Sequence, residues 1–245
     1  MRWLKLVAAP VVALSLTGCV FLPGSGGTHA PPKVLVVGDS GSYQFAEGLK
    51  HVQSGKLDVV NGGTGGCGVV PGLLDPMGIG RWQETGCPDW KTDWQQLVDR
   101  ERPDVVLLHV GFVDAFPRRG VTFGSSAADT THWNTLKEVT RILTSRGAKI
   151  LWMNVACFDP QPMLGLSWNY SDSRVKHVND LYRYYVPTQK TKQTLVDFRK
   201  YMCPRDRYSV VVNGVSARLS DGIHWTDAGA DMVARWLLPQ LLALS

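Results

Sequence analysis

The sequence predicts a single α/β domain, a three-layer α/β/α sandwich with a five-stranded parallel sheet. Two observations lead to this prediction. Short apolar runs alternate along the chain with longer stretches of helical pattern, which is typical of a parallel sheet covered by helices. The runs are apolar at successive positions, as in residues 34–37 (VLVV), rather than at every second position, which indicates strands buried on both faces.

Each element is expected where a periodic segment is bounded by turn residues. The strands are expected at residues 34–37, 57–60, 104–110, 150–155 and 194–197. The helices are expected at residues 43–52, 94–100, 133–145, 175–185 and 226–244. Ligands of such domains bind beyond the carboxyl ends of the strands, so the turns that follow the strands are the places to search for chemistry.

Composition excludes several classes of protein. The 245 residues are enough for one ordinary domain with a large core. With 44% hydrophobic and 19% charged residues, the chain is neither disordered nor a coiled coil. The formal net charge is +5 without runs of Lys or Arg, and so small an excess argues against nucleic-acid binding.

Residues 1–18 have the pattern of a bacterial lipoprotein signal peptide. Arg2 and Lys5 precede an apolar stretch, residues 6–16, that is too short to remain as a membrane-spanning helix. The stretch ends in the sequence LTGC, which resembles a lipobox. That resemblance implies that Cys19 is lipidated on sulfur and becomes the first mature residue, and two acyl chains there are enough for stable anchoring.

The rest of the chain divides accordingly into a tether and a domain. Residues 19–32 contain the cysteine and then Gly, Pro and small polar residues, a composition typical of a flexible linker. Residues 33–245 form the domain, which is expected to be extracytoplasmic and anchored by lipid to the bacterial cell membrane. An ordinary secretory signal, in which Cys19 is incidental, is the alternative.

The four cysteines other than Cys19 are even in number and suit an oxidising compartment. Cys67, Cys87, Cys157 and Cys203 allow three pairings. We favour Cys67–Cys87 and Cys157–Cys203, because each bond would close a local excursion between neighbouring strand ends. A zinc site is the alternative, but no CxxC or histidine spacing supports one, and we expect neither a metal nor another cofactor.

A serine, a histidine and an aspartate lie at the two ends of the domain. Ser40 follows the first predicted strand in a Gly-Asp-Ser turn, where a helix N-terminus can surround its hydroxyl with N–H groups. Asp221 and His224 precede the last predicted helix, and their three-residue spacing lets the carboxylate reach the imidazole. A serine nucleophile needs a base, and the base needs an orienting acid. Each residue alone fits an ordinary turn or loop, but together they predict a Ser-His-Asp triad.

The two motifs resemble blocks I and V of the SGNH (GDSL-type) hydrolase superfamily. Residues 59–66 (VVNGGTGG) are similar to block II and place its glycine at Gly66. The resemblance covers about residues 33–245 and implies a flavodoxin-like SGNH hydrolase fold. It also implies an oxyanion hole formed by the backbone N–H groups of Ser40 and Gly66.

The same resemblance implies a role for each member of the triad. Ser40 is the nucleophile, His224 is the general base and then the general acid, and Asp221 orients the imidazole. Asp39 is a rival for the orienting acid, but we interpret it as a structural residue of the turn.

Block III departs from the pattern of the superfamily. Gly-x-Asn-Asp would fall on residues 111–114 (GFVD), with Val113 in place of the asparagine. That asparagine normally supplies an oxyanion donor worth about 3 kcal/mol in the transition state, and valine cannot donate. The SGNH domains attached to, or working beside, membrane acyltransferases that O-acylate envelope glycans also lack it. Residues 66–68 (GCG) and 102–106 (RPDVV), with the Arg118-Arg119 pair, are similar to that branch.

A few residues near the predicted site are candidates for substrate binding: Asp114, Arg118, Arg119 and Trp225. An arginine pair is more often a solvated loop. Five tryptophans in or near predicted rim loops would form a sugar-stacking platform, although core packing is the commoner role: Trp82, Trp90, Trp133, Trp168 and Trp225.

Two functions therefore compete. The first is a serine esterase or O-acyltransferase that handles acetyl or other short O-acyl groups on envelope carbohydrate. Its expected partners are the acylated glycan or another ester, the membrane and a membrane acyltransferase, but no nucleic acid. The second is a catalytically degenerate lipoprotein that serves as a glycan-binding or accessory module, for which Val113 is the evidence. The retained serine, aspartate and histidine favour the enzyme.

Overall fold

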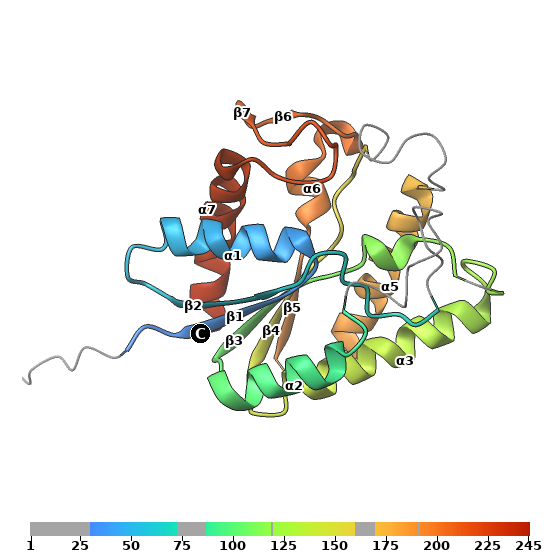
Figure 1. Ribbon diagram of the computed structural model, residues 1–245, viewed down its shortest axis with the longest axis horizontal. Coiled ribbons are helices and arrows are strands. Elements are labelled where there is room, and N and C mark those ends of the chain that lie inside the picture. The colour runs from blue at the N-terminus through green and yellow to red at the C-terminus, as the bar shows by residue number, and fades with distance from the viewer. Residues whose placement is uncertain (1–29, 73–86, 119, 160–169, 191) are drawn as a thin grey trace, which may run out of the picture. The chain divides into compact units, whose positions relative to one another are not determined.

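The computed structural model describes residues 30–72, 87–118, 120–159, 170–190 and 192–245. Residues 31–245 form one compact unit, a parallel sheet with helices on both faces (Figure 1). The predicted signal peptide, Cys19 and nearly all of the tether lie outside the described residues. Within the described part of the chain, each helix is too short or too polar to cross a bilayer.

The sheet has five strands, all parallel, in the order β2-β1-β3-β4-β5. They are β1 (Lys33–Gly38), β2 (Asp58–Gly63), β3 (Val105–His109), β4 (Lys149–Met153) and β5 (Gln193–Val196). Val36 in β1 pairs with Asn61 on one side and with Leu107 on the other. The apolar residues of the central strands are fully buried, as their continuous apolar pattern requires. The predicted fold class is confirmed.

Six α-helices cover the sheet in the described residues. They are α1 (Ser40–Val52), α2 (Trp90–Glu101), α3 (Ser126–Leu143), α5 (Asp172–Tyr185), α6 (Phe198–Met202) and α7 (Asp227–Leu244). Helices α1 and α7 pack together on one face, while α2, α3 and α5 lie on the other (Figure 1).

Four helices, α1, α2, α3 and α5, begin earlier than their apolar periodicity predicts, and side-chain caps extend two of them. Helix α1 begins at Ser40 rather than at residue 43, since the Asp39 carboxylate accepts hydrogen bonds from the first-turn N–H groups. Helix α3 begins at Ser126 rather than at residue 133, since the Ser125 hydroxyl accepts one from the Ala128 N–H. Capping satisfies backbone donors without any apolar pattern.

A short hairpin was not expected from the sequence. Strands β6 (Val211–Val212) and β7 (Val215–Ser216) pair antiparallel across Asn213 and Gly214, both of which have positive φ. Asn-Gly is the preferred pair for such a tight turn. Two-residue strands are too short for a periodicity to show, so this dipeptide was the only available signal.

Both disulfides have the pairing that we favoured. Cys67 bonds to Cys87 across 20 residues, and Cys157 bonds to Cys203 across 46. The first bond lies in the loop after β2, and the second joins the end of β4 to the end of α6. Both are therefore near the edge of the sheet at which the predicted triad lies.

The turn between β1 and α1 places Ser40 at this edge. Gly38 has φ +136°, and a Cβ on it would lie only 1.8 Å from the His109 carbonyl oxygen. A glycine is therefore required where β1 approaches the end of β3. The Asp39 N–H and the Ser42 hydroxyl both donate to that same carbonyl, at 3.2 and 2.8 Å. The chain then turns into α1 with Ser40 as its first residue.

Candidate active site

Ser40, His224 and Asp221 form a continuous chain of hydrogen bonds. His224 Nε2 lies 2.9 Å from Ser40 Oγ, and His224 Nδ1 lies 2.6 Å from Asp221 Oδ2. With Nδ1 donating to the carboxylate, Nε2 is free to accept the serine proton. The fold thus brings together residues that are 184 positions apart in the sequence, in the arrangement of a serine nucleophile with its base and orienting acid.

Asp221 is held in its ionised form by its own loop. Burial raises the pKa of its carboxyl, but hydrogen bonds from the backbone and ring of His224 and from the Ile223 N–H outweigh this and lower the pKa below its usual value. The two backbone donors lie 2.9 and 2.8 Å from Oδ1, so Oδ2 is available to the imidazole. The loop orients the carboxylate, and the carboxylate orients the ring.

The loop with Asp221 and His224 is closed by backbone contacts. The Leu219 N–H donates to the His224 carbonyl at 3.0 Å. At its tip, the Gly222 carbonyl accepts a hydrogen bond from the Asp159 N–H at 3.0 Å. Gly222 has φ +74°, and a Cβ there would lie 1.6 Å from the Asp159 carbonyl oxygen. Only glycine permits this close approach between the loop and the segment after β4.

Gln44 joins the loop that contains Asp221 and His224 to α1. Its side-chain amide donates to the Trp225 carbonyl at 2.8 Å and accepts from the Trp225 N–H at 3.2 Å. Since Gln44 is four residues after Ser40, the two side chains lie on the same face of α1. No sequence motif predicts this residue. Its helical spacing from the serine was the one signal that pointed to it.

The two N–H groups that would bind an oxyanion are available in the described part of the chain. Ser40 is the first residue of α1, where an N–H has no acceptor within the helix. Gly66 has φ +68° in a tight turn that the Thr64 N–H ties to the Gly38 carbonyl at 2.8 Å. Neither the Ser40 N–H nor the Gly66 N–H has a hydrogen-bond acceptor among the described residues. Both are therefore free to bind negative charge.

Asp39 faces away from the triad. Its Oδ1 caps α1 and lies 3.2 Å from His109 Nδ1. This geometry agrees with our interpretation of Asp39 as a residue of the turn rather than as the acid that orients His224.

Three of the four candidates for substrate binding, Asp114, Arg118 and Trp225, have buried side chains in this structure. Asp114 has no exposed surface, and Arg118 and Trp225 are only 6% and 2% exposed. Arg119, the fourth candidate, lies outside the described residues. A charged or aromatic residue beside a functional loop does not reveal in the sequence which way its side chain points.

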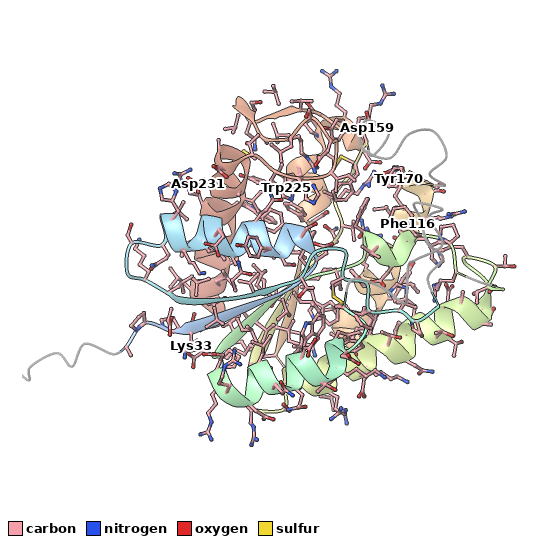
Figure 2. The ribbon with its side chains drawn as sticks, viewed as in Figure 1. Lys33, Phe116, Asp159, Tyr170, Trp225 and Asp231 are labelled. Carbon is pink, nitrogen blue, oxygen red and sulfur yellow. A yellow bond between two sulfur atoms is a disulfide. The ribbon has the colours of Figure 1, made fainter. Side chains whose placement is uncertain are left out.

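The three tryptophans of the predicted platform that the structure describes do not form a common exposed surface. Trp90 and Trp225 are buried, and Trp133 packs edge-on against Tyr185. Trp82 and Trp168 lie outside the described residues. Figure 2 shows Trp225 among the side chains between the elements, so core packing accounts for the tryptophans that are described. The exposed aromatic residue one helical turn from the serine is instead Tyr43, at 53%.

Block III contributes to the site through the packing of its loop. Val113 begins a 3-10 turn, η1 (Val113–Ala115), and is 7% exposed. Its side chain is part of the core and supplies no donor.

Among the described residues, no group of three or more His, Cys, Asp or Glu side chains is placed to hold a metal ion.

A protein-family model identifies the family of the chain. The family model described as "SGNH domain (fused to AT3 domains)" matches residues 8–239. The chain belongs to this SGNH family. The predicted membership of the SGNH superfamily is thereby confirmed. No curated protein sequence shows significant similarity to the chain.

Solved structures similar to this SGNH domain include several esterases. An acetyl esterase with a bound acetate ion aligns with a TM-score of 0.57 and 13% identity, over 87% of this chain and 97% of that one. An acetyl xylan esterase gives 0.53 and 19%, over 85% and 99%. A GDSL-like lipase from Bacteroides thetaiotaomicron gives 0.56 and 12%, over 86% and 88%. At these identities the similarity establishes the fold.

Proposed function

We propose that this SGNH protein is an extracytoplasmic serine esterase or O-acyltransferase that acts on acetyl or other short O-acyl groups of envelope carbohydrate. The observation that carries the proposal is the hydrogen-bonded chain Ser40–His224–Asp221 at the carboxyl edge of the sheet. The free N–H groups of Ser40 and Gly66 beside it support the same chemistry, because a tetrahedral intermediate needs donors at its oxyanion.

The reaction proceeds in two steps of acyl transfer. As Ser40 Oγ attacks the ester carbonyl, His224 Nε2 takes its proton, and the Ser40 and Gly66 N–H groups bind the oxyanion. When the intermediate collapses, His224 gives that proton to the departing alcohol and an acyl-serine remains. Water or a sugar hydroxyl then attacks the acyl group, giving its proton to His224, which returns it to Ser40 Oγ. Asp221 stays ionised and stabilises the imidazolium in both steps.

Three further observations support the substrate class and the compartment. The structural similarity to an acetyl esterase and an acetyl xylan esterase supports a short acyl group on a carbohydrate. The family description, in which the domain is fused to AT3 domains, supports a membrane acyltransferase as partner. The lipobox-like sequence at Cys19 and the two disulfides support an oxidising site outside the cytoplasmic membrane.

A second candidate function is a glycan-binding or accessory module. The observation in its favour is Val113, a core side chain at the position where the superfamily pattern has a donor. This protein would bind the acylated glycan without turning it over.

Labelling with a fluorophosphonate tests the proposal. The full chain, solubilised in detergent, is incubated with the reagent and its intact mass is measured. One adduct at Ser40 that is lost in Ser40→Ala and His224→Ala supports the enzyme. The matched control is His51→Ala, because His51 forms a 2.7 Å pair with Asp231 on the surface, with a 74% exposed ring. This variant must label like the native protein.

The outcomes separate the two candidates. No adduct on a folded native chain contradicts the enzyme, and calorimetric titration with acetylated glycan fragments then tests the accessory module. Where labelling occurs, a chromogenic acetyl ester with and without a glycan acceptor separates the two enzymes. An acyltransferase forms the acetylated glycan and turns over faster with the acceptor, whereas an esterase forms only acetate.

A further inference from the structure

Arg218 is a buried cation close to the catalytic loop that the proposed mechanism does not use. Its side chain is only 2% exposed. No carboxylate lies within ion-pair distance of it in the described part of the chain, and its Nε finds no hydrogen-bond partner there. Burial lowers the pKa of its guanidinium to about 9, so it remains charged at neutral pH. A buried charge without a counter-ion is unfavourable for folding and calls for another explanation.

The guanidinium of Arg218 contacts both sequence neighbours of His224. Its plane lies over the ring of Trp225, with the central carbon 3.5 Å from the ring centroid. Its Nη1 lies 3.4 Å from the carbonyl oxygen of Ile223. One guanidinium group thus contacts the residue before the histidine and the residue after it.

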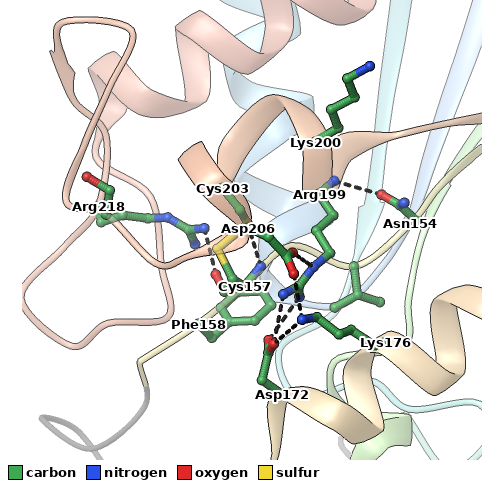
Figure 3. Close-up of a disulfide and its surroundings, with 12 residues drawn as sticks. Asn154, Cys157, Phe158, Asp172, Lys176, Arg199, Lys200, Cys203, Asp206 and Arg218 are labelled. Atoms are coloured by element: carbon green, nitrogen blue, oxygen red, sulfur yellow. Dashed lines mark hydrogen bonds and ion pairs between the residues drawn. A yellow bond between two sulfur atoms is a disulfide. The ribbon is translucent and has the colours of Figure 1, made fainter.

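The second terminal nitrogen of the guanidinium, Nη2, contacts a segment that is fixed by a disulfide. Arg218 Nη2 donates to the Cys157 carbonyl at 2.9 Å, and the guanidinium lies over the Phe158 ring at 5.2 Å (Figure 3). Cys157 is tied by its disulfide to Cys203 at the end of α6. Arg218 therefore links the loop that contains the histidine to a segment that is covalently fixed.

Neighbouring ion pairs keep that segment in place. Arg199 in α6 pairs with Asp172 of α5 at 2.8 Å and with Asp206 at 2.6 Å (Figure 3). The backbone N–H of Arg199 also donates a hydrogen bond to the side-chain oxygen of Asn154, just after β4, at 2.8 Å. The ends of β4, α5 and α6 thus form one connected support.

We propose that Arg218 is a positioning residue, which holds His224 within reach of Ser40 and Asp221 by fixing its two sequence neighbours to the Cys157 support. This inference rests on the proposed function of the triad. A planar guanidinium can donate to two carbonyls while it stacks on an indole, whereas the ammonium of lysine is a point charge without a flat face. An error of about 1 Å in the placement of a catalytic group lowers the rate by about 100-fold.

The test compares Arg218→Met and Arg218→Lys with the matched control Arg207→Met. Methionine keeps an apolar stem in the buried site, and replacement of a buried charge by an apolar group is often neutral or stabilising. Arg207 is exposed and belongs to the same part of the chain. The full chain of each variant is labelled with the fluorophosphonate, and the rate and the final extent of labelling are measured separately, together with the melting temperature.

If Arg218 is a positioning residue, its substitution should slow labelling by the fluorophosphonate without lowering the final fraction of labelled protein. Both Arg218 variants should label every molecule at Ser40, but roughly 10- to 100-fold more slowly than Arg207→Met. With a chromogenic ester, kcat should fall while KM stays near its native value. A purely structural role would instead lower the melting temperature and the labelled fraction together. That result, or a rate within twofold of the control, overturns the proposal.

A spectroscopic measurement separates this inference from the proposed function. The Nδ1 proton of His224, in its 2.6 Å hydrogen bond to Asp221, should give a downfield NMR resonance that His224→Gln removes. The resonance should be lost in Arg218→Met and kept in Arg207→Met. If native protein fails to label but this pattern is seen, the function is wrong and the positioning role stands. If Arg218→Met keeps the resonance, the positioning role is wrong.

Discussion

The buried carboxylate of Asp114 accepts a hydrogen bond from the Val70 backbone N–H at 2.9 Å. This bond ties the turn after β3 to the loop after β2, in which Gly66 presents its N–H. Cys67, the neighbour of Gly66, is fixed from the other side by its disulfide to Cys87. Block III thus supports, through its aspartate, the loop that contains Gly66, which we call the oxyanion loop after its proposed role, although Val113 supplies no donor of its own.

The burial of Asp114 predicts a pH-dependent stability. Burial raises the pKa of this carboxyl from 3.8 to about 7. The unfolded chain releases the proton near pH 4 and the folded chain near pH 7, so the folded state loses stability as pH rises between these values. Below pH 4 the penalty is absent, and above pH 7 it is fully developed. At about 1.4 kcal/mol per pKa unit, it reaches a few kcal/mol.

The variant Asp114→Asn isolates this effect, because its amide does not titrate. The stability of the variant relative to the native protein should increase steadily from pH 4 to pH 7 and then level off. Thermal unfolding at four or five pH values measures the difference. Parallel stability curves over this range would show that Asp114 does not titrate as its burial implies.

Substitution at the tip of the catalytic loop should impair both folding and chemistry. In Gly222→Ala the new Cβ would lie 1.6 Å from the Asp159 carbonyl oxygen, so the loop must move and His224 with it. We expect the labelling rate at Ser40 to fall about 100-fold. The control is Gly214→Ala, which has a similar φ of +78° but no atom within 4 Å of the new Cβ. It should lose only about 1 kcal/mol and label normally, and equal effects of the two variants would contradict this account.

Substitution of the two candidate orienting acids, Asp221 and Asp39, should lower kcat to different extents. Asp221→Asn leaves the shape of the loop but presents an amide to His224 Nδ1, and loss of the correct tautomer should lower kcat by about 10⁴. Asp39→Asn keeps an oxygen for capping α1 and should leave kcat within about tenfold. Steady-state hydrolysis of a chromogenic acetyl ester measures both values. A larger loss in Asp39→Asn than in Asp221→Asn would exchange their roles.

The two disulfides should differ in what they stabilise. From the lengths of the loops that they close, 46 and 20 residues, chain entropy predicts losses of about 4 kcal/mol in Cys157→Ser/Cys203→Ser and about 3 kcal/mol in Cys67→Ser/Cys87→Ser. The second variant also frees the loop of Gly66, so its labelling rate should fall even where the fold persists. Denaturant unfolding and labelling of both variants test this. Normal labelling by Cys67→Ser/Cys87→Ser would show that the bond does not support the oxyanion loop.

Much of the fold could be predicted from the sequence, because its signals are local. A strand buried on both faces needs continuous apolar residues, so runs such as residues 34–37 reveal the sheet. Residues of a reacting triad must also be of particular chemical types, and so Ser40, Asp221 and His224 could be named before any geometry was known. Element boundaries were less accurate where a capping side chain rather than an apolar pattern decides them, as at Ser126.

Which other polar residues lie near the triad and which lie in the core could not be predicted from the sequence. Asp114, Arg118 and Trp225 were candidates for substrate binding, and their side chains are buried. Gln44 and Arg218, which contact the loop of Asp221 and His224 and its neighbours, belong to no motif in the sequence. Residue type determines what chemistry a side chain can do, whereas its direction and partners depend on contacts between segments far apart in the chain. The fold class and the residues of the predicted triad could thus be read from local patterns, whereas the contacts that support them follow from packing.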